Sequence, residues 1–139
     1  MGETRIITRI SRIRKALKRE FELRAAPLEI TSSQLQVLRR LWQGDGITTS
    51  ALTCDSASDG GTVTGILDRL ERKELIRRER SHADRRVVQI WLTDAGRALQ
   101  QPLTQIIGEI NERALVGLDC GEQEQLIRAL EKVAANLDA

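Results

Sequence analysis

Residues 59–92 have the sequence DGGTVTGILDRLERKELIRRERSHADRRVVQIWL, and this stretch decides the fold because its hydrophobic period changes half-way along. In the first half, apolar residues recur at the i, i+3, i+4, i+7 spacing of one helix face: Val63, Ile66, Leu67 and Leu70. In the second half, apolar residues alternate as in a strand: Val88, Ile90 and Leu92. The basic segment LIRRER (75–80) reads as a shorter strand, and SHADRR (81–86) as the turn between the two. The stretch therefore predicts a helix followed by a two-stranded β-ribbon.

The start of this helix and the tip of this ribbon both suit a nucleic acid. A helix that opens on Gly60, Gly61 and Thr62 presents free backbone N–H groups and a positive dipole end, which favour phosphate. The short hydroxyl side chains there can approach base edges. Arginines at a ribbon tip can enter a minor groove, where the potential is most negative. A helix followed by a basic ribbon is typical of a winged-helix nucleic-acid reader.

The residues before this stretch predict three further helices. The first covers 3–25 and ends before Pro27. Thr31 and Ser32 are good N-caps for a second helix over 33–43, which the glycines of residues 44–46 stop. Ile47 is a candidate one-residue strand, and residues 48–50 can cap a short third helix. With a small-residue turn at 55–58 and a fourth helix from Asp59, the pattern predicts a helix-turn-helix.

The residues after the ribbon predict two more helices. Thr93 caps a fifth helix that runs to about Val116, and Pro102 inside it predicts a kink or a helix that begins afresh. Asp119 and Glu122 form a capping box for the last helix. The expected fold is mainly α with a small β-ribbon, a winged helix-turn-helix with long terminal helices. The first helix carries an apolar stripe that needs a covering surface, from its own chain or a second one: Ile6, Ile7, Ile10, Ile13, Leu17 and Phe21.

Composition and charge narrow the partner. The 139 residues are 40% hydrophobic and 30% charged, as expected for a single soluble domain. The chain has only one Phe, two Trp and no Tyr, which disfavours recognition of single strands or RNA by base stacking and favours duplex DNA. Basic residues are concentrated locally: residues 1–24 hold eight against three acidic ones, and residues 60–90 eight against five.

Several other classes find little support in the sequence. No apolar run reaches the roughly 20 residues of a membrane span, and no signal peptide is visible, so we expect a cytoplasmic protein. Cys54 and Cys120 have no CxxC spacing, and His82 is the single histidine, so we expect no metal, no cofactor and no disulfide framework. The sequence has no P-loop, GxGxxG or nucleophile motif, so we expect no enzyme.

Three segments resemble the MarR family of bacterial winged-helix transcription regulators: ITSSQLQVLRRL (30–41), GTVTGILDRLERKELIRR (61–78) and DRRVVQIWLTDAGRAL (84–99). The resemblance implies one domain over 1–139, with dimerisation helices in 1–29 and 99–139 and a DNA-binding lobe in 30–98. It implies a homodimer that binds a near-palindromic double-stranded DNA operator, acts as a repressor and is released by a small molecule or an oxidant.

By position, the resemblance places Thr62 and Thr64 in the major groove and Arg86 in the minor groove, with Asp84 orienting that arginine. Two residues depart from the family pattern. Gly65 stands where many members have arginine, so base readout shifts toward neighbouring residues, and Glu74 replaces a usual glycine, so the turn lacks an unstrained left-handed cap. The complete set of expected DNA-binding residues is Thr48, Ser50, Gly61, Thr62, Thr64, Asp68, Arg69, Arg78, His82, Asp84, Arg85 and Arg86.

Plainer interpretations stay open beside these. The basic ribbon could be merely solvated, or the winged helix could be a protein-interaction module that binds an acidic partner. Leu38 and Trp42 could be core residues or the wall of a pocket for a small aromatic effector. Cys54 could be a small buried hydrophobe or a redox sensor, and Cys120, at a helix start, is the other thiol candidate.

Overall fold

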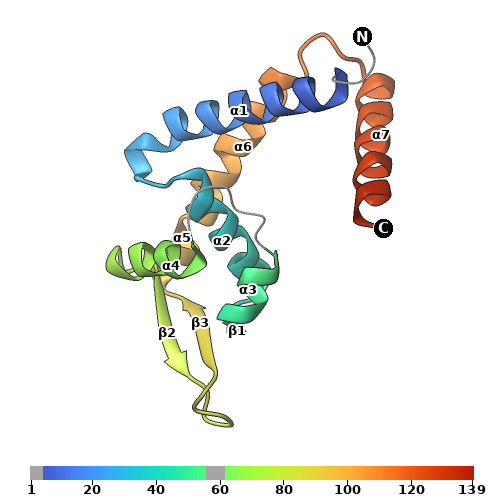
Figure 1. Cartoon of the computed structure of the whole chain (residues 1–139). Helices are drawn as coiled ribbons and strands as arrows, with labels where there is room; N and C mark the ends of the chain where they lie inside the picture. Colours follow the sequence, from blue (N-terminus) through green and yellow to red (C-terminus); the bar gives the residue numbers. More distant parts are fainter. Residues whose placement is uncertain (1–4, 56–61) are drawn as a thin grey trace. The chain divides into compact units, whose positions relative to one another are not determined.

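The structure of the chain is a computed structural model that describes residues 5–55 and 62–139 (Figure 1). It forms two compact units, residues 1–107 and residues 108–139. The first unit contains α1 (Arg5–Ala25), a 3-10 turn η1 (Ala26–Leu28), α2 (Ser32–Gln43), β1 (Ile47–Thr48), α3 (Thr49–Asp55), α4 (Val63–Arg72), β2 (Ile76–Arg80), β3 (Val88–Leu92) and α5 (Asp94–Ala98). Helix α6 (Gln100–Ala114) begins in the first unit and ends in the second, which also holds α7 (Cys120–Asp138). The predicted mainly helical fold with a small β-ribbon is confirmed.

Side-chain caps fix the helix starts. At α2, the Thr31 hydroxyl accepts from the Gln34 N–H at 3.2 Å, and the Gln34 amide oxygen accepts from the Thr31 N–H at 3.2 Å. At α7, Asp119 and Glu122 make the predicted reciprocal pair at 2.8 and 3.3 Å. Both helices therefore begin where short polar side chains satisfy backbone donors that have no intrahelical partner.

Two predicted helix boundaries need correction. The fourth helix was expected from Asp59, which lies outside the described residues, but Thr62 is extended and the helix begins at Val63. The fifth helix was expected to run from Thr93 to about Val116. Instead α5 ends at Ala98 and α6 begins afresh at Gln100, the second of the two outcomes expected near Pro102. Pro102 thus lies in the first turn of a helix, where its missing N–H leaves no hydrogen bond unmade.

The sheet is small, and its register determines which arginines face the protein. Its strand order is β1-β3-β2, and both pairings are antiparallel. Ile76 pairs with Leu92, and Arg78 pairs with Ile90. Because side chains alternate between the two faces, Arg78 lies on the same face of β2 as the buried Ile76. That face contacts α4.

The core of the first unit is aliphatic and joins the helix-turn-helix to the sheet. Helix α2 contacts α4 and β3, and α3 contacts α4. The whole predicted stripe of α4 is buried. The largest fully buried side chains are Leu38, Leu41, Leu52, Leu67, Leu70, Ile76, Ile90 and Leu103. The exposed face of α4 is therefore held on a rigid base.

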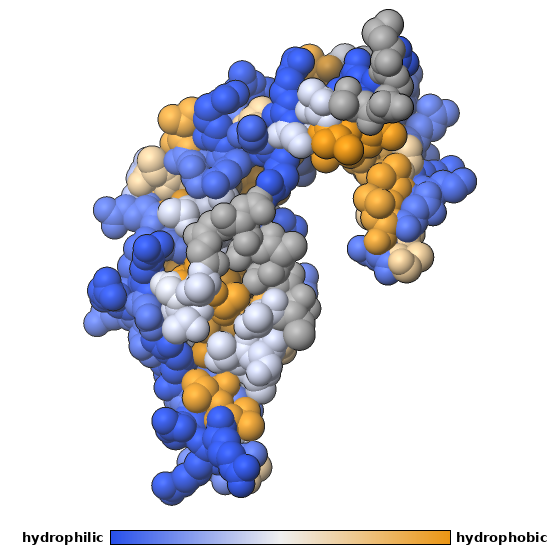
Figure 2. Space-filling view, in the orientation of Figure 1, coloured by the Kyte–Doolittle hydropathy of each residue, from blue (hydrophilic) through white to orange (hydrophobic). Residues whose placement is uncertain are grey.

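Helices α1 and α7 keep most of their apolar side chains exposed. In α1 only Phe21 and Ala25 are buried, and α7 has no buried residue. Figure 2 shows hydrophobic side chains running along α7. Exposed large hydrophobic residues of the two helices include Ile6, Ile7, Ile10, Ile13, Leu126, Ile127, Leu130 and Leu137. Among the described residues, no helix has the length and apolarity needed to cross a bilayer.

Candidate nucleic-acid interface

Helix α4 presents a short polar face to solvent. Thr62 is its N-cap, and the Thr62 hydroxyl oxygen accepts from the Gly65 N–H at 3.1 Å. The side chains of Thr62, Thr64 and Arg69 are exposed. Because the Thr62 oxygen is used as an acceptor, its hydroxyl hydrogen is left to donate outward. The helix start thus offers hydroxyl donors and, one turn later, a cation.

Arg78 of β2 points toward α4 and is engaged there by two carboxylates. Its guanidinium donates to Asp68 and, at 3.0 Å, to Glu71. The second carboxylate oxygen of Glu71 accepts from the Arg78 backbone N–H at 3.3 Å. The Glu71 hydrogen bond, followed by that of Asp68, raises the pKa of the Arg78 guanidinium. The Arg78 side chain is 26% exposed and that of Asp68 46%, and their ion pair joins α4 to the wing. The predicted DNA contacts of Arg78 and Asp68 stay predictions.

The turn between β2 and β3 is held by hydrogen bonds among its own residues, from both side chains and backbone. The Ser81 hydroxyl accepts from the Ala83 and Asp84 N–H groups, at 3.2 and 3.4 Å. The Asp84 carbonyl accepts from the Val87 N–H at 3.0 Å. The Asp84 carboxylate accepts from the Arg86 backbone N–H, also at 3.0 Å. Asp84 therefore acts on Arg86 through the main chain, which fixes where the arginine side chain leaves the turn.

This turn leaves cations exposed at the tip of the ribbon, which extends away from the helices of the first unit (Figure 1). His82, Arg85 and Arg86 are all exposed. Arg80 donates from its guanidinium to the Arg85 carbonyl at 2.9 Å and so braces the turn from the neighbouring strand. In Figure 2 the tip of this ribbon is mostly hydrophilic, with a hydrophobic patch just above it. A charged, braced tip of this kind is suited to a polyanion.

Comparisons with known proteins identify this arrangement. Residues 30–88 match the MarR family. The chain is 33% identical over 109 residues to the HTH-type transcriptional regulator MgrA of Staphylococcus aureus, which covers 78% of this chain and 73% of MgrA. The chain belongs to the MarR family of transcriptional regulators.

Solved MarR-type structures have the same fold. A complex of S. aureus MepR with DNA superposes with a TM-score of 0.82 at 28% identity, covering 98% of each chain. A MarR regulator from Methanosarcina mazei Go1 superposes with a TM-score of 0.88 at 24% identity, covering 98% of this chain and 91% of that one. The sequence resemblance to the MarR family is thereby confirmed over nearly the whole chain.

The two departures from the MarR pattern have clear local structures. Gly65 lies in the first turn of α4, where, among the described residues, an added Cβ would meet the Thr62 hydroxyl alone, at 3.3 Å. Glu74 adopts the left-handed conformation with φ of 61°, so the turn after α4 keeps its glycine-like shape without a glycine. The Glu74 carbonyl accepts from the Thr93 hydroxyl at 2.7 Å, which fixes the turn against the start of α5.

The remaining expected DNA-binding residues have different surroundings. Thr48 is half-buried and accepts from the Ala51 N–H at 3.1 Å, so it caps α3. Ser50 is exposed on α3. Gly61 lies outside the described residues.

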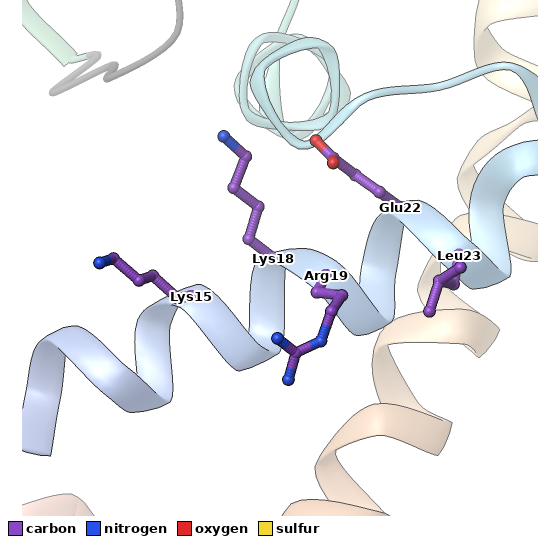
Figure 3. Close-up of a pocket in the computed structure, with 5 residues that line it drawn as sticks. All are labelled: Lys15, Lys18, Arg19, Glu22 and Leu23. Carbon is purple, nitrogen blue, oxygen red and sulfur yellow. The ribbon is translucent and has the colours of Figure 1, made fainter.

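The two residues expected to form an effector pocket pack inside the first unit. Leu38 is fully buried, and the half-buried Trp42 donates from its indole N–H to the Gly96 carbonyl at 3.0 Å. A surface pocket of about 350 Å³ lies on α1 instead, lined by Lys15, Lys18, Arg19, Glu22 and Leu23 (Figure 3). Neither Leu38 nor Trp42 lines that pocket. The role of these two residues in binding an effector stays a prediction.

The cysteines are placed only in part. Cys120 is exposed and is the first residue of α7. Cys54 belongs to α3, but its side chain lies outside the described part of the chain. Within the described residues, no group of three or more His, Cys, Asp or Glu side chains could hold a metal ion.

Sequence reasoning missed the residues that brace this MarR lobe from within. Asp45 accepts from the Leu92 N–H at 3.0 Å and from the Arg97 guanidinium at 2.8 Å, which joins the end of α2 to β3 and α5. The Lys73 ammonium donates to the Glu29 carbonyl, before α2, and to the Gln34 amide oxygen, within α2. Strand alternation was the available signal for Arg78, because it places that side chain on the face of Ile76. For Asp45 and Lys73 the partners are 39 or more residues away in sequence, and no local pattern points to them.

Proposed function

We propose that this MarR-family transcription regulator is a homodimeric repressor that binds a near-palindromic duplex DNA operator through α4 and the β2–β3 wing. A small-molecule or oxidant signal releases it. The observation that carries the proposal is the pair of exposed features on one braced lobe: the hydroxyl face of α4 and the arginine tip of the wing. The proposed role is regulatory rather than enzymatic, and the protein acts in the cytoplasm, where its operator DNA is.

The contacts divide by chemistry. Thr62, Thr64 and Arg69 read the major groove, since they are exposed polar residues of the first two turns of α4 and base contacts specify sequence. Arg86 enters the minor groove, and His82 and Arg85 contact phosphates near it. Ser50 and Gly61 approach the DNA backbone at the helix-turn-helix. Asp68, Arg78, Thr48 and Asp84 support these contacts through the hydrogen bonds described above.

Dimerisation uses the terminal helices. The exposed aliphatic side chains of α1 and α7 need a covering surface, and a second copy of the chain supplies one of matching chemistry. We expect this interface to bury on the order of 2,000 Å² or more, as obligate dimers do. Residues 1–29 and 99–139 then form the dimerisation region of a single domain, and residues 30–98 form the DNA-binding lobe.

The test begins with selection of operators from random duplex DNA, followed by titration at several salt concentrations. Arg86→Ala should weaken operator binding by ~1–3 kcal/mol and lower the salt slope by about one unit, since one phosphate-proximal cation is lost. Arg128→Ala is the matched control, because it removes the same charge from the exposed surface of α7.

Three results would contradict the proposal. Selection that yields no preferred sequence would refute operator recognition and would favour an acidic protein partner. Unchanged operator affinity in Arg86→Ala, with an intact melting curve, would exclude the wing tip. An equal effect of Arg128→Ala would show that only net charge matters.

A further inference from the structure

The first turn of α2 collects contacts from two other helices. Gln34, in this turn, is only 4% exposed, and its amide oxygen already accepts from the Thr31 N–H in the capping box. The same oxygen also accepts from the Lys73 ammonium at 3.1 Å. Two donors hold this buried amide side chain in place, because losing either hydrogen bond would leave its oxygen under-satisfied in a low-dielectric site.

Lys73 connects Gln34 to α4. It is the C-cap of α4, and its backbone N–H donates to the Arg69 carbonyl at 3.1 Å. Its ammonium also donates to the carbonyl of Glu29, a residue held in the left-handed conformation between η1 and α2. A cation at the C-terminal end of a helix is favoured by the dipole. The Lys73 side chain thus joins the end of α4 to the α1–α2 connection at two acceptors.

The first turn of α2 is also hydrogen-bonded to α1. The Ser32 hydroxyl, at the first residue of α2, donates to the Glu22 carboxylate of α1 at 3.3 Å. The first turn of α2 is therefore fixed to α1 by one hydrogen bond and to α4 by another. Since the capping box fixes its backbone as well, this turn can resist a movement of α4.

We propose that Lys73 is a positioning residue for DNA recognition, which sets the tilt of α4 by tying its C-terminal end to the first turn of α2. Arg78 binds Asp68 in the middle of the same helix and Glu71 near its end, so α4 is held against the wing by Arg78 and against α2 by Lys73. This role rests on the proposed DNA-binding function of α4. Lys73 itself does not contact the DNA, because its ammonium is directed at Glu29 and Gln34.

Loss of the Lys73 contacts should lower the discrimination between DNA sequences more than it lowers the affinity for DNA in general. Helix α4 has ten residues, so it is about 15 Å long, and a tilt of about 4° moves one end by about 1 Å relative to the other. Base contacts require placement to within roughly 0.5 Å. Contacts of long cations with phosphates tolerate such a shift, since they depend mainly on charge.

The experiment compares Lys73→Met with the matched control Arg72→Met. Arg72 is the neighbouring cation, exposed and without an ion pair among the residues that the structure describes. Each variant is titrated with the selected operator and with a scrambled duplex at two salt concentrations. Lys73→Met should lower the operator-to-scrambled affinity ratio about 10-fold, the effect of one charge-assisted hydrogen bond, without changing the salt slope. Lys73→Arg, which keeps a donor, should recover most of the ratio, and Arg72→Met should leave it within about twofold.

Two outcomes would overturn this role. An equal loss on both duplexes, with the salt slope lower by about one unit, would make Lys73 a phosphate contact. A lower melting temperature with an unchanged affinity ratio would make the tether merely structural.

A double-mutant cycle of Lys73→Met with Gln34→Met, measured by urea unfolding of the DNA-free protein, tests the contact itself. Favourable coupling between the two side chains is expected, and its absence would also overturn the proposal. Failure of the proposed DNA-binding function can be distinguished from failure of the Lys73 proposal. In that case the unaltered protein would show no operator preference, while the coupling between Lys73 and Gln34 would persist.

Discussion

The winged-helix lobe buries its hydrophobic side chains, whereas the terminal helices leave most of theirs exposed. In α4 every residue of the apolar stripe is buried, whereas in α7 no residue is buried, although both stripes have helical spacing. The lobe also pairs charges inside itself, at Arg78 with Asp68 and at Arg97 with Asp45. The same sequence pattern therefore means a closed core in one region and an open surface in the other. What separates the two is whether the chain supplies its own covering surface.

The largest expected effect comes from placing a charge on the open surface. Leu130 of α7 is 49% exposed, and Leu130→Glu should prevent dimerisation because a carboxylate would have to lose its water in an aliphatic interface. Operator affinity should fall by at least about 100-fold, since two linked half-site contacts become independent ones. Sedimentation should show a dimer of the 15.6 kDa chain before the substitution and a monomer after it.

Ala135→Glu is the control, because it adds the same charge on the opposite, polar face of α7. It should leave both the dimer and the affinity unchanged. If the unaltered protein sediments only as a 15.6 kDa species at micromolar concentration, the open surface has another role.

The sequence predicted the elements of the closed lobe well because their hydrophobic periods are strong. It misplaced the start of α4, since Asp59 and Thr62 are both good N-caps and the sequence alone does not decide between them. It also left open whether the segment from Thr93 to Val116 is one kinked helix or two, because the apolar spacing is continuous across Leu99 and only Pro102 marks the break.

The site was predicted less completely than the fold. The exposed residues Thr64 and Arg86 follow from spacing, because a buried stripe defines the face opposite to it. The pairing of Arg78 with Asp68 and Glu71 depends on how β2 lies against α4, a tertiary property that composition does not contain. The structure shows that Arg78 braces the wing against α4, and its predicted contact with DNA stays a prediction.

An intermediate effect is expected from Gly96, which has the least room for a Cβ among the described glycines. A Cβ added at Gly96 would lie 2.1 Å from the backbone carbonyl oxygen of Leu75, so the start of α5 would have to move away from the turn before β2. Gly96→Ala should lower the free energy of unfolding by about 1–3 kcal/mol, as overpacking does. Displacement of the Gly96 carbonyl, which accepts from Trp42, should also change the Trp fluorescence.

Gly108→Ala is the matched control, since a Cβ there meets no atom of residues 5–55 or 62–139 within 4 Å. It should raise the stability by about 1 kcal/mol through helix propensity. Urea unfolding of the two variants measures the contrast directly. A Gly96→Ala protein as stable as the unaltered one would mean that the lobe is less tightly closed than its contacts indicate.

The smallest effect concerns a strained residue that the closed lobe tolerates. Glu74 holds the left-handed conformation after α4, with φ of 61°, which glycine adopts without strain and other residues adopt at a cost. Glu74→Gly should raise the stability by about 1 kcal/mol, partly offset by the greater entropy of glycine in the unfolded chain. Thermal unfolding should show a rise of a few degrees for Glu74→Gly and none of that size for Glu74→Ala, which removes the charge but keeps the Cβ. Equal shifts in the two variants would show that the carboxylate, rather than the backbone strain, destabilises this turn.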